Sequence, residues 1–183
     1  MSTFRFAIMG AGNIAHQFCD AVTLVEDCEV SAIASKDLGR AQKFAEECSV
    51  AHAYDNYEQM LIEEKPDCVY IAVTPNDHFR LTMLCLEHRV PVLCEKAMFT
   101  NSAEAKAVFE KAEKDQTFVM EAMWSRFLPA VNQAKKWAAE GKIGRLEALQ
   151  GRIGFLAPEG ADNRYHSPLL CGGAATDITV YAY

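Results

Sequence analysis

Residues 4–15, FRFAIMGAGNIA, decide the fold of the chain. An apolar strand runs into the two glycines of a G-x-G-x-x-A pattern, and a helix-forming stretch opens at Asn13. Gly10 permits a tight turn, Gly12 lets the backbone approach a pyrophosphate, and Ala15 allows the helix to pack closely on the strand. A helix N-terminus also offers amide donors and a partial positive charge to a diphosphate. This strand–loop–helix unit predicts a dinucleotide-binding loop.

Short apolar segments alternate with amphipathic ones from this loop to about residue 122. We expect strands at residues 4–10, 29–35, 51–54, 68–73, 91–94 and 117–120, separated by helices at residues 13–26, 38–48, 57–64, 76–88 and 101–115. Uniformly apolar strands between helices are typical of a parallel sheet that is covered on both faces. The fold class is therefore α/β, a doubly wound parallel sheet, in a first domain of residues 1–122.

The pattern changes in residues 123–183, which we interpret as the beginning of a second α/β domain that binds substrate. A helix is expected at residues 129–140, and the weak alternation at residues 146–155 predicts a strand of a different sheet. Residues 157–173 form an irregular connection, and the last ten residues resemble the first turns of a helix. Because the chain stops there without closing strands, we expect it to be a fragment.

Composition excludes several classes of partner. The 183 residues carry a net charge of −7 and no basic run, which argues against nucleic acid and anionic membrane surfaces. No stretch approaches the roughly 18 apolar residues of a membrane span. The seven cysteines form no C-x-x-C pair, so we interpret them as reduced core thiols of a cytoplasmic protein. We expect no metal ligand set.

The end of the second predicted strand bears on which cofactor is bound. An NAD-binding loop usually has an acid there for the ribose hydroxyls, but this chain has Ser35, followed by Lys36 and, one turn later, Arg40. A hydroxyl and two cations suit a 2′-phosphate, so we expect NADP, with NAD as the alternative. Lys36 and Arg40 could instead be solvated helix residues, and Asp37 remains a candidate ribose ligand.

The fourth predicted strand ends in Thr74, Pro75 and Asn76. Ligands of open α/β sheets bind outside the carboxyl ends of the strands, so we expect these residues to face the cofactor. Asn76 could equally be the N-cap of the next helix. His78 lies just inside that helix, where a histidine is more often structural than functional.

Two further clusters carry groups for proton transfer. Glu95 and Lys96 follow the fifth strand at the same edge, where the lysine could hold a substrate oxygen; the alternative is a surface ion pair. Asp177 and Tyr181 are spaced i, i+4, so they would share a helix face. A free tyrosine has a pKa near 10, and Lys96 could be the cation that lets it work near neutrality.

Taken together, these motifs resemble the Gfo/Idh/MocA family of nicotinamide-dependent oxidoreductases. The matching stretches are GAGNIA (10–15), VTPNDH (73–78), VLCEKA (92–97), EAMWSRFLP (121–129) and GGAATDITVY (172–181). The similarity is greatest to the family's NADP-dependent dihydrodiol and D-xylose dehydrogenase branch. It implies a Rossmann domain followed by a substrate-binding domain with a large open sheet, and a homo-oligomer in the full-length form.

The resemblance also implies roles for single residues. Lys96 would contact substrate and nicotinamide, Tyr181 would be the acid/base, and Asp177 would support it. Trp124 and Phe155 would line the pocket of a small-molecule substrate.

The chain departs from the family pattern at two of its motif positions. Ala97 replaces the proline of E-K-P, which often follows a cis bond in the family, and Thr179 replaces the glycine of D-x-G-x-Y.

We therefore expect an enzyme that transfers hydride between the nicotinamide and a CH–OH group of a sugar, polyol or diol. The cofactor would be held by Gly10, Gly12, Asn13, Ile14, Ser35, Lys36, Arg40, Thr74, Pro75, Asn76, Glu95 and Lys96, and the catalytic residues would be Lys96, Asp177 and Tyr181. The alternative is a nucleotide-binding module without turnover, either a regulator that responds to NADP or a truncated relic.

Overall fold

The computed structural model describes residues 3–160 and 163–182. It divides into two compact units, Met1–Glu121 and Ala122–Tyr183. The expected irregular connection and the expected final helix extend to residues 161–162 and Tyr183, which lie outside the described residues.

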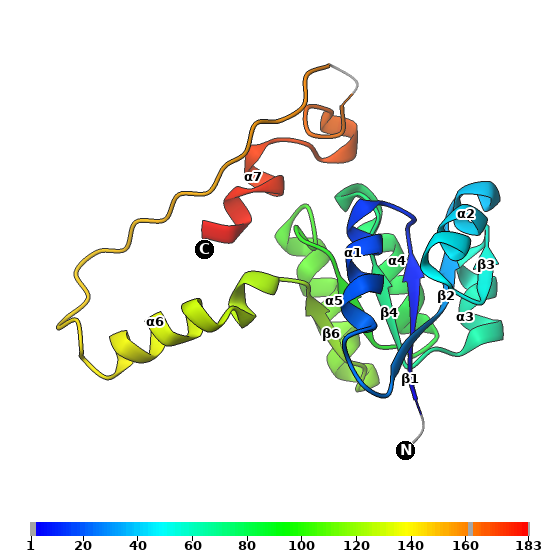
Figure 1. Ribbon diagram of the computed structural model, residues 1–183, viewed down its shortest axis with the longest axis horizontal. Helices are drawn as coiled ribbons and strands as arrows, with labels where there is room; N and C mark the ends of the chain where they lie inside the picture. Colours follow the sequence, from blue (N-terminus) through cyan, green and yellow to red (C-terminus); the bar gives the residue numbers. More distant parts are fainter. Residues whose placement is uncertain (1–2, 161–162, 183) are drawn as a thin grey trace. The chain divides into compact units, whose positions relative to one another are not determined.

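The first unit contains one parallel sheet of six strands (Figure 1). The strands are β1 (Phe4–Met9), β2 (Cys28–Ala34), β3 (His52–Tyr54), β4 (Cys68–Ile71), β5 (Val92–Cys94) and β6 (Val119–Glu121). They lie in the order β3-β2-β1-β4-β5-β6. The chain therefore winds outward from β1 in one direction, returns across the sheet, and winds outward from β4 in the other. This arrangement confirms the predicted doubly wound sheet.

Five helices connect these strands: α1 (Asn13–Val22), α2 (Leu38–Cys48), α3 (Tyr57–Glu64), α4 (Pro75–Glu87) and α5 (Ser102–Asp115). Three of them begin at a polar side chain that accepts a bond from a backbone amide of the first turn. Asp37 caps α2 at 2.9 Å, Asn56 caps α3 at 3.0 Å and Asn101 caps α5 at 3.0 Å. Such caps satisfy amides that have no partner within the helix, and the cap at Asp37 confirms the predicted start of α2.

The core lies between the sheet and the helices on its two faces. Because right-handed crossovers to β2 and β3 run opposite to those to β5 and β6, α1 and α2 cover one face and α3, α4 and α5 the other. The main cluster combines strand residues with α3 and α4 side chains and includes Met9, Ala34, Met60, Leu61, Val69, Ile71, Leu81 and Val92. The uniformly apolar strands are thus explained by burial on both sides.

Gly10 is the point where β1 meets the end of β4. Its φ is +110°, and a Cβ at this position would lie 2.7 Å from the carbonyl oxygen of Ala72. Ala72 in turn donates its amide to Met9, at 2.8 Å. Only glycine combines that dihedral angle with that closeness.

Most predicted boundaries of the first unit agree with the structure to within one or two residues, and the largest difference is at α1. Helix α1 ends at Val22 instead of residue 26, and the Thr23 hydroxyl bonds to the carbonyl of Asp20 at 2.7 Å. Hydroxyl groups of this kind compete with the helical backbone bonds. Strand β6 begins at Val119, because the Thr117 amide still bonds to Ala112 of α5, at 2.9 Å.

The second unit contains a 3-10 turn (Trp124–Phe127), α6 (Pro129–Ala139), a 3-10 turn (Pro168–Leu170), α7 (Ala174–Asp177) and a final 3-10 turn (Thr179–Ala182). The strand expected at residues 146–155 is wrong, since this stretch has no regular secondary structure and no paired strand among the described residues. A strand without a partner leaves its amides and carbonyls unpaired, so weak alternation alone does not produce one.

The continuous helix expected from residue 174 onward is also wrong. Ile178 follows α7 with φ −130° and ψ −36°, outside helical values, and a 3-10 turn begins at Thr179. Asp177 and Tyr181 therefore do not share the face of one α-helix.

Replacing Gly10 with alanine should destabilise the chain by about 3 kcal/mol, because the added methyl meets a backbone carbonyl at a strained φ. Urea unfolding of Gly10→Ala and Gly12→Ala provides the matched test. At Gly12 the nearest atom to an added Cβ is 3.9 Å away, so its change should stay within about 1 kcal/mol. Equal stability of the two variants would contradict this account.

Candidate functional site

The carboxyl ends of β1, β2, β4 and β5 lie along one edge of the sheet, because these strands are neighbours and parallel. The edge carries the glycine loop after β1, Ser35 to Arg40 after β2, Thr74 to Asn76 after β4, and Glu95 with Lys96 after β5. The structure thus brings all the predicted cofactor residues to one side of the sheet, around the point between β1 and β4 where the winding direction reverses. Open α/β sheets bind ligands at such a point.

The glycine loop fits a diphosphate. Gly12 is the N-cap of α1 and has no side chain that could cap the helix. A Cβ added to Gly12 would lie 3.9 Å from its nearest neighbour, the carbonyl oxygen of Ala72. Asn13 and Ile14, the first two residues of the helix, are exposed. An exposed helix N-terminus without a side-chain acceptor is suited to bind an anion.

Helix α4 begins in the same manner at this edge. Its N-cap is Thr74, whose side chain makes no capping bond, and Pro75 is the first helical residue. The alternative role of Asn76 as the N-cap is therefore wrong. Asn76 is the second residue of the helix and is exposed.

The turn after β2 places Arg40 against the glycine loop. Its guanidinium donates to the Ala11 carbonyl at 3.4 Å. Ser35 is buried, and the Asp37 carboxylate accepts from the Arg40 amide at 2.9 Å. Because one oxygen of Asp37 is used as a helix cap, this carboxylate is less suited to a ribose than the sequence alone suggests.

Lys36 has a partner that the sequence analysis did not identify. Its Nζ lies 2.5 Å from the Asp77 carboxylate of α4, and Arg80 approaches the same carboxylate at 3.4 Å. Burial would raise the pKa of Asp77, but the hydrogen bond and charge of Lys36, together with Arg80, hold this pKa below its ordinary value. The position of Asp77, an acid in the first turn of the helix that follows Thr74, is the sequence signal that could have identified it as the partner of Lys36.

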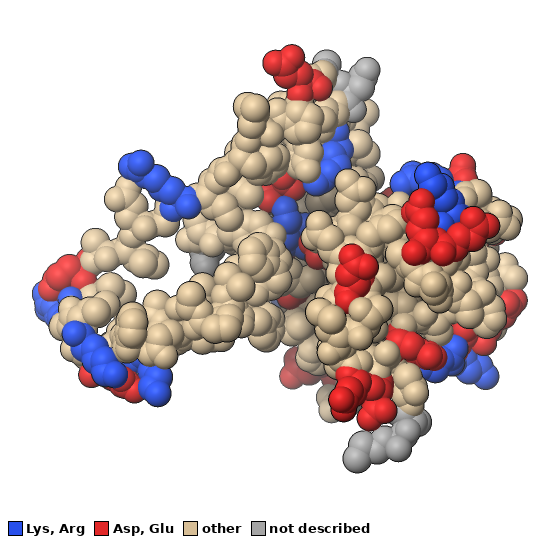
Figure 2. Space-filling model, in the orientation of Figure 1, with Lys and Arg blue, Asp and Glu red and all other residues tan. Residues whose placement is uncertain are grey.

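The outer surface of α2 carries mixed charge. Figure 2 shows Lys and Arg side chains beside Asp and Glu side chains over this helix, and Lys43 approaches Glu47 at 3.7 Å. Attraction of a phosphate to this part of the surface therefore depends on individual cations rather than on a broad basic area.

Glu95, the acid that follows β5, is a buried carboxylate with hydrogen-bond partners. Tyr70 of β4 donates its hydroxyl to Glu95 at 2.6 Å, and the Lys96 amide donates to it at 3.2 Å. Burial raises the pKa of Glu95, although both hydrogen bonds oppose the shift. Tyr70 is itself stacked on Phe18 of α1, with ring centroids 4.0 Å apart. Glu95 therefore anchors the start of the loop.

The Lys96 loop, residues 95–98, is held on several sides. The Lys96–Ala97 peptide bond is cis, so the bond occurs here without the family's proline. The Met98 amide donates to the Glu121 carboxylate at 2.9 Å, and the ring of His78 contacts the carbonyls of Ala97 and Met98. Lys96 is partly exposed at the edge of the sheet.

The second unit groups some of the predicted substrate-side residues. Trp124 donates its indole N–H to the Tyr181 hydroxyl at 2.9 Å, and the two rings meet edge to face at 5.9 Å. Asp177 is 3.6 Å from Arg164, while Phe155 packs against Tyr165 with centroids 5.2 Å apart. Tyr181 and Lys96 belong to different units, and their joint action stays a prediction.

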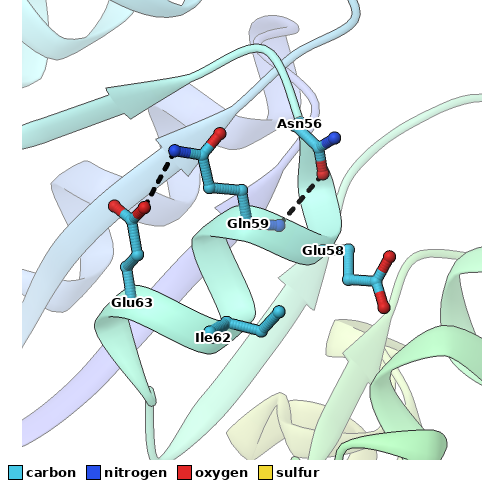
Figure 3. A pocket seen from close by; sticks show the side chains of 5 residues that line it. All are labelled: Asn56, Glu58, Gln59, Ile62 and Glu63. Carbon is cyan, nitrogen blue, oxygen red and sulfur yellow. Dashed lines mark hydrogen bonds between the residues drawn. The ribbon is translucent and has the colours of Figure 1, made fainter.

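A surface hollow lies on α3, the helix that follows β3. It encloses about 350 Å³ and is lined by Asn56, Glu58, Gln59, Ile62 and Glu63. Figure 3 shows that its polar groups bond to one another: the Gln59 amide to Asn56 at 3.0 Å, and the Gln59 side chain to Glu63 at 2.8 Å. Glu58, the remaining polar residue of the lining, contacts His88 at 3.3 Å instead.

Within residues 3–160 and 163–182, no helix is long and apolar enough to cross a membrane. The same residues contain no cluster of three or more His, Cys, Asp or Glu side chains that could hold a metal ion. The seven cysteines all lie in this part of the chain, and none forms a disulfide. Four are buried, but Cys28, Cys48 and Cys171 are only partly so, so the expectation of core thiols holds for four.

The sheet order, the glycine loop and the uncapped helices at its edge define a dinucleotide-binding Rossmann protein. Residues 4–123 match the family model described as an oxidoreductase family with an NAD-binding Rossmann fold. The chain belongs to this family, Gfo/Idh/MocA, as its motifs indicated.

Curated relatives and solved structures agree with this assignment. The trans-1,2-dihydrobenzene-1,2-diol dehydrogenase of Mus musculus is 36% identical over 182 residues, covering 97% of this chain and 53% of that protein. An NAD-binding protein from Listeria innocua superimposes with a TM-score of 0.87 at 22% identity, over 99% of this chain and 53% of that one. A variant of a 3-ketoreductase from Actinomadura kijaniata, in complex with TDP-benzene and NADP, gives 0.72 at 26% identity, over 79% and 44%. The chain spans about half the length of the curated relatives it matches.

Replacing Glu95 with glutamine should make stability less sensitive to pH. The pKa of Glu95 is raised on folding, so its contribution to stability is present below the ordinary value of 4.5 and is lost as the pH rises through the folded value. The free energy of unfolding of Glu95→Gln should therefore rise relative to the native protein as pH increases from about 4.5, where a neutral amide and a protonated carboxyl are nearly equivalent.

Urea unfolding at several pH values measures this difference. Glu110→Gln is the control, because Glu110 is an exposed partner of Lys106 and its replacement should change stability by less than about 0.5 kcal/mol at every pH. A constant difference between Glu95→Gln and the native protein would contradict the assignment.

Proposed function

We propose that this chain is the cofactor-binding part of an NADP-dependent dehydrogenase that acts on the CH–OH group of a sugar, polyol or diol. The observation that carries the proposal is the carboxyl edge of the sheet. There Gly10 closes the turn against Ala72, and Gly12 leaves the N-terminus of α1 open. A diphosphate would lie on the α1 amides, with Thr74, Pro75 and Asn76 facing it from the neighbouring turn.

The preference for NADP rests on the groups at the end of β2. Ser35 replaces the acid that favours NAD, and Asp37 is engaged as a helix cap. Lys36 and Arg40 are cations on the two sides of this turn, one reaching α4 and the other the glycine loop. A 2′-phosphate would bind both cations.

For the chemistry, a bound nicotinamide supplies a hydride acceptor. Tyr181, as the phenolate, would take the hydroxyl proton of the substrate, and the indole N–H of Trp124 would stabilise charge on its oxygen. Lys96 would hold the substrate oxygen, and Asp177 would support the pair. Trp124 and Phe155 would contribute to the substrate pocket.

The name of one relative bears on the class of substrate. The name of the mouse relative, a dihydrodiol dehydrogenase, supports a cyclic diol or a sugar as substrate. We further propose that residues 123–183 begin the substrate domain, and that the full-length protein is a cytoplasmic homo-oligomer that acts on small molecules.

Replacing Lys36 with glutamine should weaken NADPH about tenfold, because a charge-assisted contact to the 2′-phosphate is lost, and leave NADH within about twofold. Fluorescence titration of both cofactors measures this. Lys43→Gln is the matched control, since Lys43 is a cation of α2, the helix that follows Lys36, and pairs with Glu47. Equal weakening of both cofactors would assign Lys36 to another part of the dinucleotide.

In the full-length protein, replacing Lys96 with methionine or Tyr181 with phenylalanine should lower turnover about 100-fold or more while NADPH still binds, because each change removes a group that acts on the proton or the substrate oxygen. NADPH formation from trans-1,2-dihydrobenzene-1,2-diol, aldoses and cyclic polyols is the measurement. Full activity in either variant would remove that residue from the mechanism. Tight NADPH binding by the full-length protein without turnover on any of these substrates would favour the binding module instead.

A further inference from the structure

His78 is a fully buried histidine whose two ring nitrogens both face main-chain carbonyl oxygens. It belongs to the first turns of α4. Nε2 lies 3.1 Å from the carbonyl oxygen of Val73, and Nδ1 lies 3.0 Å from that of Ala97 and 3.2 Å from that of Met98. One side chain therefore contacts two segments that are far apart in the sequence.

Both of these segments flank proposed cofactor residues. Val73 immediately precedes Thr74, Pro75 and Asn76, and its carbonyl belongs to the turn between β4 and α4. Ala97 and Met98 immediately follow Lys96. The ring of His78 thus links the Lys96 loop to the β4–α4 turn.

The protonation state of the His78 ring decides how many of these carbonyl oxygens receive a hydrogen bond. A neutral imidazole has one N–H, so one of its nitrogens then faces a carbonyl oxygen without a proton, whereas the charged ring donates from both. Burial lowers the pKa of His78, against the effect of the three carbonyl contacts and of Asp77. A leucine in this place would remove the ring's N–H donor from the carbonyl oxygens of Val73, Ala97 and Met98.

We propose that His78 is a positioning residue, which ties the Lys96 loop to the β4–α4 turn and so sets where Lys96 stands relative to the nicotinamide ring. The inference rests on the proposed function, because it assigns His78 to the nicotinamide end of the dinucleotide site. The phosphate loop opens α1, Arg40 lies on α2 and Lys36 precedes α2. Lys36 reaches α4 at Asp77, beside His78, whereas the hydrogen bonds of the His78 ring go to the carbonyls of Val73, Ala97 and Met98.

The test compares two ligands that differ only at the nicotinamide: NADP⁺ and 2′-phospho-ADP-ribose. In His78→Leu, the dissociation constant of NADP⁺ should rise about tenfold while that of 2′-phospho-ADP-ribose stays within about twofold. His78→Gln, which keeps an N–H donor, should recover part of the loss. The control is His88→Gln, on the same helix, where the ring contacts the exposed Glu58 at 3.3 Å; both ligands should bind it as they bind the native protein.

A purely structural role for His78 would weaken both ligands equally or change only thermal stability, and either result would overturn the proposal. Failure of the native chain to bind either ligand would instead overturn the proposed function, and this inference with it.

A measurement on the unmodified protein covers the case in which the leucine variant does not fold. The ring nitrogen signals of His78 in the NMR spectrum should shift on addition of NADP⁺ but not of 2′-phospho-ADP-ribose. Signals that respond equally to both ligands, or to neither, would also contradict the positioning role.

Discussion

The close approach of Gly10 to Ala72 is the constraint on which the carboxyl edge of the sheet, the proposed cofactor site, depends. At this point β1 and β4, neighbours in the sheet but about 60 residues apart in the chain, both turn outward into helices. Because a Cβ at Gly10 would lie 2.7 Å from the Ala72 carbonyl, the two turns can approach only over a bare backbone. Their helices, α1 and α4, then begin side by side at the edge where the winding reverses, which is where this class of sheet receives its ligands.

The order of elements in the first unit was predictable because each strand is apolar throughout and each helix has its own start or stop residue. Asp37 marked the start of α2, and the αL residue Lys65 ends α3 just before Pro66. Such signals are local, so a single sequence carries them. The stretch at residues 146–155 failed for the opposite reason: a strand depends on a partner, and no neighbouring strand is present in the described part of the chain. The helix bearing Asp177 and Tyr181 failed at Ile178, where the backbone leaves helical values.

The candidate site shows the same contrast between features that the sequence indicates and features that depend on a distant partner. Residues at strand ends could be placed from topology, because parallel neighbours deliver their carboxyl ends to one edge. Their partners could not, since pairing across elements depends on side-chain reach. Asp77 contacts Lys36 across 41 positions of the sequence, and Tyr70 contacts Glu95 across 25. A histidine at the start of a helix is more often structural than functional, yet the ring nitrogens of His78 contact carbonyls that flank two proposed cofactor loops. Topology says which ends of strands meet, while the polar contacts between them require coordinates.

The distribution of helix caps has a consequence for the stability of the folded chain. Helices α2, α3 and α5 carry side-chain caps, whereas α1 and α4, the two that begin at the cofactor edge, do not. Amides that a side chain would otherwise satisfy are left to the solvent or to a ligand. A dinucleotide that binds there acts as an exchangeable cap, and it adds RT ln(1 + [L]/Kd) to the free energy of unfolding. The lifetime of the folded chain against heat or proteases would then follow the concentration of its cofactor.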